Sequence, residues 1–259
     1  MMKKNIPLLL IIFIFGNMLY ACSDNKIPVT AEIDKAVANA IIAENKGRYE
    51  EGECVGEGHI VLGVDKKGDN TIVYALTMYG EYGFQNDIFT KISGSGVIPA
   101  VLDFEEKDNN YICTNFKYPE DGALHQKSLN EMFPSKYRNL IKYTNEDDRN
   151  LTFQEEKYAK DYLRSIGRSA QILKYKDFDH ILLTDRGVSV EVSNKVPGKD
   201  LPNYPYWIGK CEKIENGMRV VYEMIYNQND KYIVFKKYEY ESKKELEFIK
   251  YNAQTGERA

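Results

Sequence analysis

The chain has 259 residues, of which 43% are hydrophobic and 29% charged, so it can build a packed core and is not expected to be disordered. With 35 basic against 39 acidic residues its formal charge is -4, which argues against nucleic-acid binding because that function usually needs a basic face. Only one apolar run approaches membrane length, at the N-terminus, and this excludes a polytopic membrane protein.

The N-terminus predicts a targeting segment. Lys3 and Lys4 precede an apolar run over residues 8–15, which is shorter than the roughly 20 residues of a spanning helix. The junction over residues 19–22, Leu-Tyr-Ala-Cys, resembles a bacterial lipobox. We therefore expect a lipoprotein signal peptide over 1–21, acylation of Cys22, and a tether over 22–30. The alternative is an ordinary signal peptide with an incidental cysteine.

After Cys22, three cysteines remain, and an odd number cannot pair completely. Cys54 and Cys113 fall in predicted strands of the same half and could form a disulfide in an oxidising exterior. The favoured interpretation is that Cys54, Cys113 and Cys211 are small buried hydrophobic residues.

The first half of the chain predicts one helix followed by strands. Thr30 is a suitable N-cap for a helix over 31–45, with apolar residues at helical spacing, and Gly47 ends it. Short segments rich in Val, Ile, Tyr and Thr then alternate with turns. The predicted strands cover 59–64, 71–79, 88–92, 97–104 and 111–117.

A short helix over 124–132, which ends at Pro134, is predicted near the end of the first half. The second half predicts a similar order, beginning with a longer helix that starts among the acidic residues 145–148 and ends before Gly167. Predicted strands follow at 180–183, 188–192, 207–214, 218–226, 231–240 and 246–251. The sequence thus predicts an α+β fold of two halves, 31–143 and 144–259, each a helix plus an antiparallel β-meander.

Several segments together resemble an extracytoplasmic region of clostridial-type bacteria. They are residues 74–84, 93–101, 118–122, 132–134, 187–195 and 204–209. In those bacteria the region occurs fused behind membrane metallopeptidases of the beta-lactam sensor/antirepressor family, and sometimes as a separate lipoprotein. The resemblance implies an envelope sensor or accessory role, and it carries over no active residue.

The catalytic motifs of that family are absent. None of the three histidines, His59, His125 and His180, begins a His-Glu-x-x-His motif, and the one Ser-x-x-Lys match, Ser23 to Lys26, falls in the tether. We expect no metal, no cofactor and no covalent beta-lactam chemistry.

Aromatic residues supply the candidate binding surface. Tyr is abundant, with 20 copies, and two clusters fall near Gly or Pro in predicted loops. The candidate contact residues are Tyr82, Phe84, Tyr204, Tyr206 and Trp207. The competing interpretation is that such rings fill the core, and that Trp207 in particular opens a strand and packs inside.

These observations favour a lipid-anchored binding or sensory-accessory protein on the extracytoplasmic face of the cell membrane, without catalysis. Its expected partners are the membrane, through the acyl chains, and a membrane metallopeptidase or other envelope protein. The alternative is an envelope hydrolase acting on peptidoglycan or peptide, with His180 or His125 beside a carboxylate. A third interpretation is a purely structural surface protein.

Overall fold

The computed structural model describes residues 27–108, 110–196 and 201–259 and confirms the predicted α+β fold. Its strands form a single antiparallel sheet of nine strands, with helices on both faces. The predicted signal peptide, Cys22 and most of the tether lie outside the described residues.

The described helices are α1 (Ala31–Asn45), α2 (His125–Met132), α3 (Ser135–Arg138), α4 (Asn145–Ser165) and α5 (Val190–Lys195). The strands are β1 (Cys54–Lys67), β2 (Asn70–Gln85), β3 (Ile88–Gly94), β4 (Ile98–Lys107), β5 (Asn110–Lys117), β6 (Gly209–Glu215), β7 (Met218–Ile225), β8 (Tyr232–Glu239) and β9 (Glu245–Asn252).

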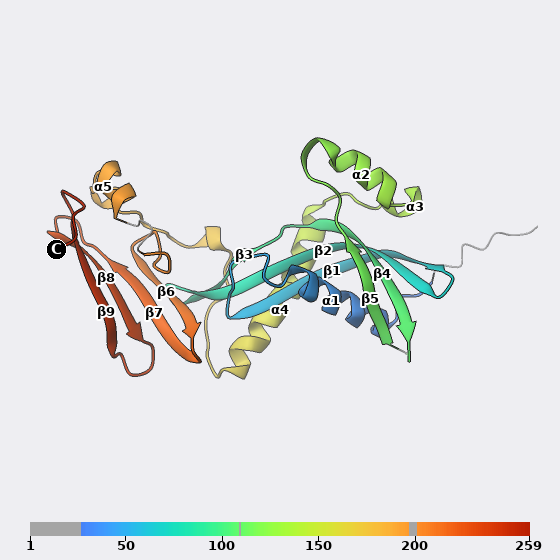
Figure 1. The fold of residues 1–259 in the computed structure, drawn as a ribbon, viewed down its shortest axis with the longest axis horizontal. Helices are drawn as coiled ribbons and strands as arrows, with labels where there is room; N and C mark the ends of the chain where they lie inside the picture. Colours follow the sequence, from blue (N-terminus) through green and yellow to red (C-terminus); the bar gives the residue numbers. More distant parts are fainter. Residues whose placement is uncertain (1–26, 109, 197–200) are drawn as a thin grey trace, which may run out of the picture.

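Strand β2 is the centre of the N-terminal part of the sheet. It pairs along its length with β1, and on its other edge first with β4 and then with β3. At its last residue, Gln85, it also pairs with Cys211 of β6, which begins the second meander, β6 to β9. The two meanders therefore occupy opposite ends of an elongated molecule (Figure 1).

The two long helices begin where local capping dictates. The Thr30 hydroxyl accepts a hydrogen bond from the Ile33 N–H at the start of α1. At the start of α4 the Thr144 hydroxyl accepts from the Asp147 N–H, and the Asp147 carboxylate accepts from the Thr144 N–H in return. Both predicted helices are confirmed for this reason.

Alternate residues of β2 point to opposite faces of the sheet and meet different helices. Val73, Ala75 and Tyr79 pack in the core that contains α1. The intervening side chains pack with α2–α3 or with α4; they are Tyr74, Leu76, Met78, Tyr82 and Phe84. The core of the N-terminal meander is therefore double, with one layer on each side of β2.

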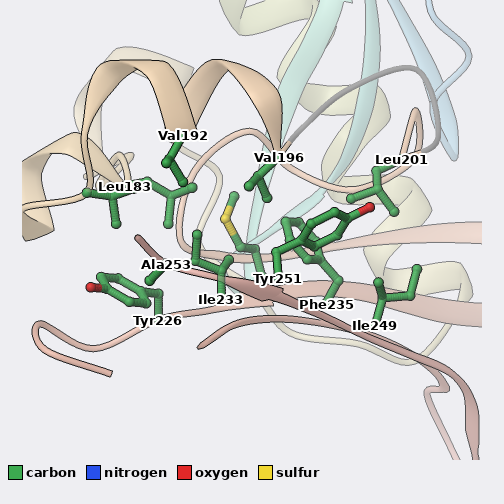
Figure 2. Close-up of a cluster of buried hydrophobic side chains, with 12 residues drawn as sticks. Leu183, Val192, Val196, Leu201, Tyr226, Ile233, Phe235, Ile249, Tyr251 and Ala253 are labelled. Carbon is green, nitrogen blue, oxygen red and sulfur yellow. The ribbon is translucent and has the colours of Figure 1, made fainter. Parts of the chain in front are cut away.

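The C-terminal meander has a core on one face only. Side chains from α5 and the segments around it pack onto β7, β8 and β9, and Figure 2 shows them gathered between α5 and the strands. Phe235 and Ile233 are completely buried at its centre.

The predicted boundary at 143/144 is displaced by the packing of α4. This helix lies against β1 and β2, so it belongs with the N-terminal meander, and the C-terminal meander is covered by α5 instead. The predicted strands at 180–183 and 188–192 are wrong. The Ser189 hydroxyl accepts from the Val192 N–H and caps α5, and Gly187 turns the chain there with φ of 84°.

The thiols of Cys54, Cys113 and Cys211 are free, and β2 and β4 separate the strands of the first two. None of the helices within the described ranges combines the length and apolar character that a membrane span requires.

Candidate functional site

A pocket of about 1210 Å³ lies where the two meanders join, and we call it the junction pocket. It is lined by the last residues of β2, residues 50–53, the end of β3, the loop 202–207 and β6. The volume exceeds the ~300–1,000 Å³ typical of small-molecule sites. An oligomeric ligand would therefore fit it better than a single small molecule.

Aromatic rings and charged groups together line this pocket. The aromatic residues are Phe84, Tyr162, Tyr175, Tyr204, Tyr206 and Trp207. The charged residues are Glu50, Glu51, Glu53, Glu212, Glu215, Lys91 and Lys213. The lining thus combines flat apolar surfaces with hydrogen-bonding groups, as binding sites for polar ligands do.

Two of the predicted contact residues lie in a strand. Tyr82 and Phe84 belong to β2 rather than to a loop, and their side chains are 2% and 1% exposed. Gly80 and Gly83, which suggested a loop, instead leave room on β2 for side chains of β3. Phe84 still reaches the pocket lining, whereas Tyr82 packs against α4.

The other three predicted contact residues do share a loop that borders the junction pocket. Tyr206 is 58% exposed, and its hydroxyl lies 2.7 Å from that of Tyr175. Tyr204 is half-buried and its hydroxyl donates to Glu247. Trp207 is only 4% exposed, which agrees with the competing interpretation that it packs inside.

Polar atoms without partners occur beside these rings. The indole N–H of Trp207 and the side-chain oxygen of Gln85 are buried, and neither has a hydrogen-bond partner among the described residues. Both residues line the pocket. Because a buried polar group without a partner costs free energy, these atoms are suited to a ligand that supplies a donor and an acceptor.

A cluster of four charged side chains adjoins the pocket and contributes Glu53 and Glu212 to its lining. Arg219 pairs with both Glu53 and Glu212, and Arg168 makes a two-point contact with Glu212 at 2.6 and 3.1 Å. The Arg168 guanidinium also lies 3.5 Å from the centre of the Phe84 ring. Since Glu53 and Glu212 are 3% and 2% exposed, the cluster is a buried ionic contact between the meanders.

Further pairing leaves the pocket nearly neutral. Lys213 lies 3.4 Å from Glu50, and Glu215 lies 2.6 Å from Lys237. Lys91 pairs at 2.9 Å with Glu155, which is completely buried, and burial raises the pKa of Glu155 to about 7 although Lys91 opposes the shift. The lining therefore offers paired donors and acceptors rather than a strong net charge.

His180 and His125, the candidates of the hydrolase alternative, do not form an acid–base pair in the described part of the chain. The His180 ring stacks on Tyr175 at 3.9 Å and stands against Trp207, and its Nε2 has no partner there. Burial lowers the pKa of His180. His125 starts α2 away from the pocket, and its side chain forms no ion pair with a carboxylate of the described residues.

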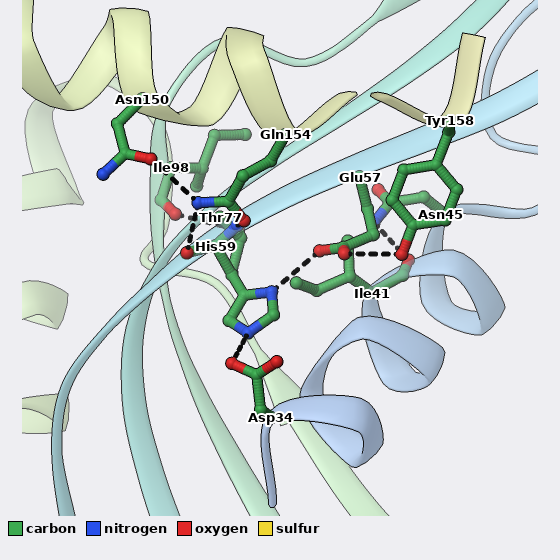
Figure 3. A network of polar contacts seen from close by, with 10 residues as sticks. All are labelled: Asp34, Ile41, Asn45, Glu57, His59, Thr77, Ile98, Asn150, Gln154 and Tyr158. Carbon is green, nitrogen blue, oxygen red and sulfur yellow. Dashed lines mark hydrogen bonds and ion pairs between the residues drawn. The ribbon is translucent and has the colours of Figure 1, made fainter. Parts of the chain in front are cut away.

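A third histidine, His59, lies in a polar network that sequence reasoning missed (Figure 3). Its Nδ1 lies 2.9 Å from Glu57 and its Nε2 lies 3.1 Å from Asp34 of α1. Burial opposes protonation of His59, but the hydrogen bonds and charges of Glu57 and Asp34 outweigh it and raise its pKa. With a carboxylate at each nitrogen, the ring is suited to hold a proton rather than to abstract one.

Helix α4 fastens this network to the edge of the sheet. Gln154 accepts from the His59 backbone N–H and donates to the His59 carbonyl, both at 3.0 Å, and Tyr158 donates to Glu57 (Figure 3). At this edge of the sheet the Gln154 amide makes the two backbone hydrogen bonds with His59 that a neighbouring strand would otherwise make. Together these hydrogen bonds hold α1, β1 and α4 against one another, so the network has a structural role.

The surroundings of the cysteine thiols and of the potential metal ligands do not favour a reactive site among the described residues. Burial raises the pKa of both Cys54 and Cys211 to about 12, so these thiols are weak nucleophiles. Within the ranges that the structure describes, no three His, Cys, Asp or Glu side chains gather as a metal site would require.

Sequence reasoning found the loop 204–207 but not the ionic cluster. Glu53, Arg168, Glu212 and Arg219 are far apart in the chain and lie together only because β6 reaches β2.

Comparison with family models, with curated proteins and with solved structures finds no match for this chain.

Proposed function

We propose that the protein is a lipid-anchored, extracytoplasmic binding or sensory-accessory protein without a catalytic centre, and that its ligand occupies the junction pocket. The observation that carries this proposal is the pocket lined by six aromatic residues, including four of the five that the sequence singled out. Anchoring at Cys22 and the association with a membrane metallopeptidase come from the sequence alone.

The lining favours a peptidoglycan fragment as ligand. Sugar rings present apolar faces that can stack on Tyr and Trp, while their hydroxyl and amide groups need donors and acceptors. The paired charges, Trp207 Nε1 and Gln85 Oε1 offer both. The size of the pocket also suits several linked units.

The proposal can be tested by titrating the full chain with soluble disaccharide-peptide fragments of peptidoglycan. Trp207 is the only tryptophan and borders the pocket, so its fluorescence should change on binding. Tyr206→Ala should weaken binding about 2- to 10-fold, the effect expected for loss of one aromatic contact. Its melting temperature should stay close to that of the wild type, because Tyr206 is largely exposed.

Phe153→Ala is the matched control, since Phe153 is 66% exposed on α4 and does not line the pocket. It should bind as the wild type does. Equal affinity of the Tyr206→Ala variant and the wild type would refute the assignment of the pocket. Cleavage of the fragments, detected by mass spectrometry, would favour the hydrolase alternative.

A further inference from the structure

The C-terminal meander has a second face, which is buried beside β6, where Val221 is 2% exposed, but is not covered by a described helix over β8 and β9. Strand register places Glu223, Lys236 and Phe248 side by side on it, and Val234 beside Lys250. We call this surface the outer face; it comprises Glu223, Ile225, Tyr232, Val234, Lys236, Tyr238, Phe248 and Lys250. None of these side chains belongs to a buried cluster of the described residues, whereas the opposite face packs under α5 (Figure 2).

Lysine side chains lie over the aromatic rings of the outer face. The Lys236 and Lys250 amino groups are 5.7 and 5.0 Å from the centre of the Phe248 ring. At the two ends of the face, Lys231 lies over Tyr232 at 5.1 Å and Lys243 over Tyr238 at 5.7 Å. The lysine ammonium groups on this face therefore make cation–π contacts with the rings beneath them.

These four lysines make no ion pair with any described residue. Three carboxylates lie near Tyr238 of this face, those of Glu223, Asp87 and Glu212. Asp87 pairs with Lys210 at 2.8 Å and Glu212 pairs with Arg168 and Arg219, whereas Glu223 stands next to Lys236 on the neighbouring strand without pairing with it. In a chain of formal charge -4 the outer face is thus a local excess of positive charge.

We propose that the outer face binds an anionic polymer whose repeating charges are phosphodiester groups. Ammonium groups bind phosphate as point charges, and the rings beneath them hold the lysine side chains in place across the face. A membrane surface fits less well, because the lysines stand over the rings and Phe248 is only 43% exposed, so little apolar surface protrudes for insertion. The assignment does not depend on what the junction pocket binds.

The test measures binding of full-length protein to poly(glycerol phosphate) over a range of salt concentrations. Binding should weaken linearly in log–log form as salt rises, by about 0.7 in slope for each phosphate neutralised. Lys236→Gln with Lys250→Gln should lower the slope by about 1.4 and reduce affinity about tenfold or more at low salt. Lys231→Gln with Lys243→Gln provides a second variant at the exposed ends of the face.

The matched control is Lys127→Gln with Lys160→Gln, which removes two exposed lysines from α2 and α4. It should leave slope and affinity unchanged. The proposal is overturned if the control and either outer-face variant behave alike, or if the protein binds vesicles of phosphatidylglycerol but not the polymer. A dimer that the Lys236→Gln, Lys250→Gln variant dissociates would also overturn it, since the face would then be a self-association surface.

Tyr206→Ala separates this proposal from that for the junction pocket. It should leave polymer binding intact while weakening fragment binding, because Tyr206 and the outer face belong to different surfaces.

Discussion

The protonated form of His59 is stabilised by its contacts in the folded protein. Its ring lies between Glu57 and Asp34, and these carboxylates raise its pKa above the value of about 6.5 expected in an unfolded chain. A folded state that binds the proton more tightly gains stability at low pH. That stability should be complete below pH 6.5 and should be lost as the pH rises through the raised pKa.

His59→Gln should remove this pH dependence. At pH 6 we expect the variant to be less stable by about 2 kcal/mol, because charged hydrogen bonds to two carboxylates are lost. Between pH 6 and pH 9 the free energy of unfolding should fall more steeply in the wild type than in the variant. Urea unfolding across that range measures both effects.

His125→Gln serves as the control, because the His125 side chain makes no hydrogen bond with a described residue. Its pH profile should follow that of the wild type. A wild-type profile that rises with pH over the same range would show that His59 does not hold a proton in the folded protein.

Single residues show how far the candidate site could be predicted. The loop position of Tyr204 and Tyr206 follows from the neighbouring prolines, which a sequence displays directly. Tyr82 and Phe84 were misplaced because Gly80 and Gly83 normally indicate turns. Here the missing side chains make room for Lys91 and Ile92 of β3, a contact between strands that no local pattern reveals.

Helix α4 and strand β1 lie in unusually close backbone contact. A Cβ atom added at Gly58 would lie 2.5 Å from the carbonyl oxygen of Leu151, and one at Gly56 would lie 2.8 Å from that of Glu155. Both neighbours are backbone atoms and cannot turn aside. The two glycines therefore set the distance at which Gln154 can reach the His59 backbone.

Gly58→Ala should force the helix away from the strand. We expect a loss of about 2–3 kcal/mol in unfolding free energy, comparable with overpacking a core. The backbone amide of His59, bonded to Gln154 in the wild type, should also exchange its hydrogen faster. Thermal unfolding and amide exchange measure the two effects.

Gly96→Ala is the paired control, since nothing lies within 4 Å of its added Cβ and its φ lies outside the left-handed range. It should change the unfolding free energy by less than about 0.5 kcal/mol. Equal effects of the two substitutions would contradict the close approach of α4.

Among the helices and strands, the sequence predicted correctly those whose ends depend on neighbouring residues. Helices α1 and α4 begin at Thr30 and Thr144, whose capping bonds involve residues three positions away. The strand assigned to 188–192 failed because alternating valines also suit a short helix once Ser189 caps it. Which meander α4 covers depends on glycines of β1 almost a hundred residues earlier, and its own sequence cannot specify this.

The whole molecule depends on a narrow connection between its two meanders. Strands β2 and β6 share one residue pair, Gln85 with Cys211, supplemented by hydrogen bonds between Asn86 and Lys210. Ion pairs also join the meanders: Lys210 with Asp87 and Lys213 with Glu50 are partly exposed, whereas the cluster of Arg219 and Arg168 with their glutamates is buried. Cooperation between the meanders during unfolding should therefore depend on that cluster.

Arg219→Met should uncouple the two ends of the molecule. Removing one member of a buried ionic group leaves Glu53 and Glu212 partly uncompensated, at a cost of about 3–5 kcal/mol. Trp207 packs on Tyr175 and His180 at the junction pocket, so its fluorescence reports on the junction of the meanders, whereas circular dichroism reports on the whole sheet. In the variant the fluorescence transition should fall at lower denaturant than the circular dichroism transition.

Lys66→Met removes a lysine whose partner, Glu106, is also exposed, so it should leave unfolding nearly unchanged. Coincident transitions in the Arg219→Met variant, at the wild-type midpoint, would show that the cluster does not couple the meanders.

The single pair between β2 and β6 also has a mechanical consequence. The meanders lie in series along the long axis (Figure 1), so tension applied to the two chain ends passes through this connection. Long strand ladders such as β1–β2 share a shearing force over many hydrogen bonds, whereas the Gln85–Cys211 pair has almost none to share. In a protein tethered at one end and holding a polymer at the other, this connection would extend first and leave both meanders intact.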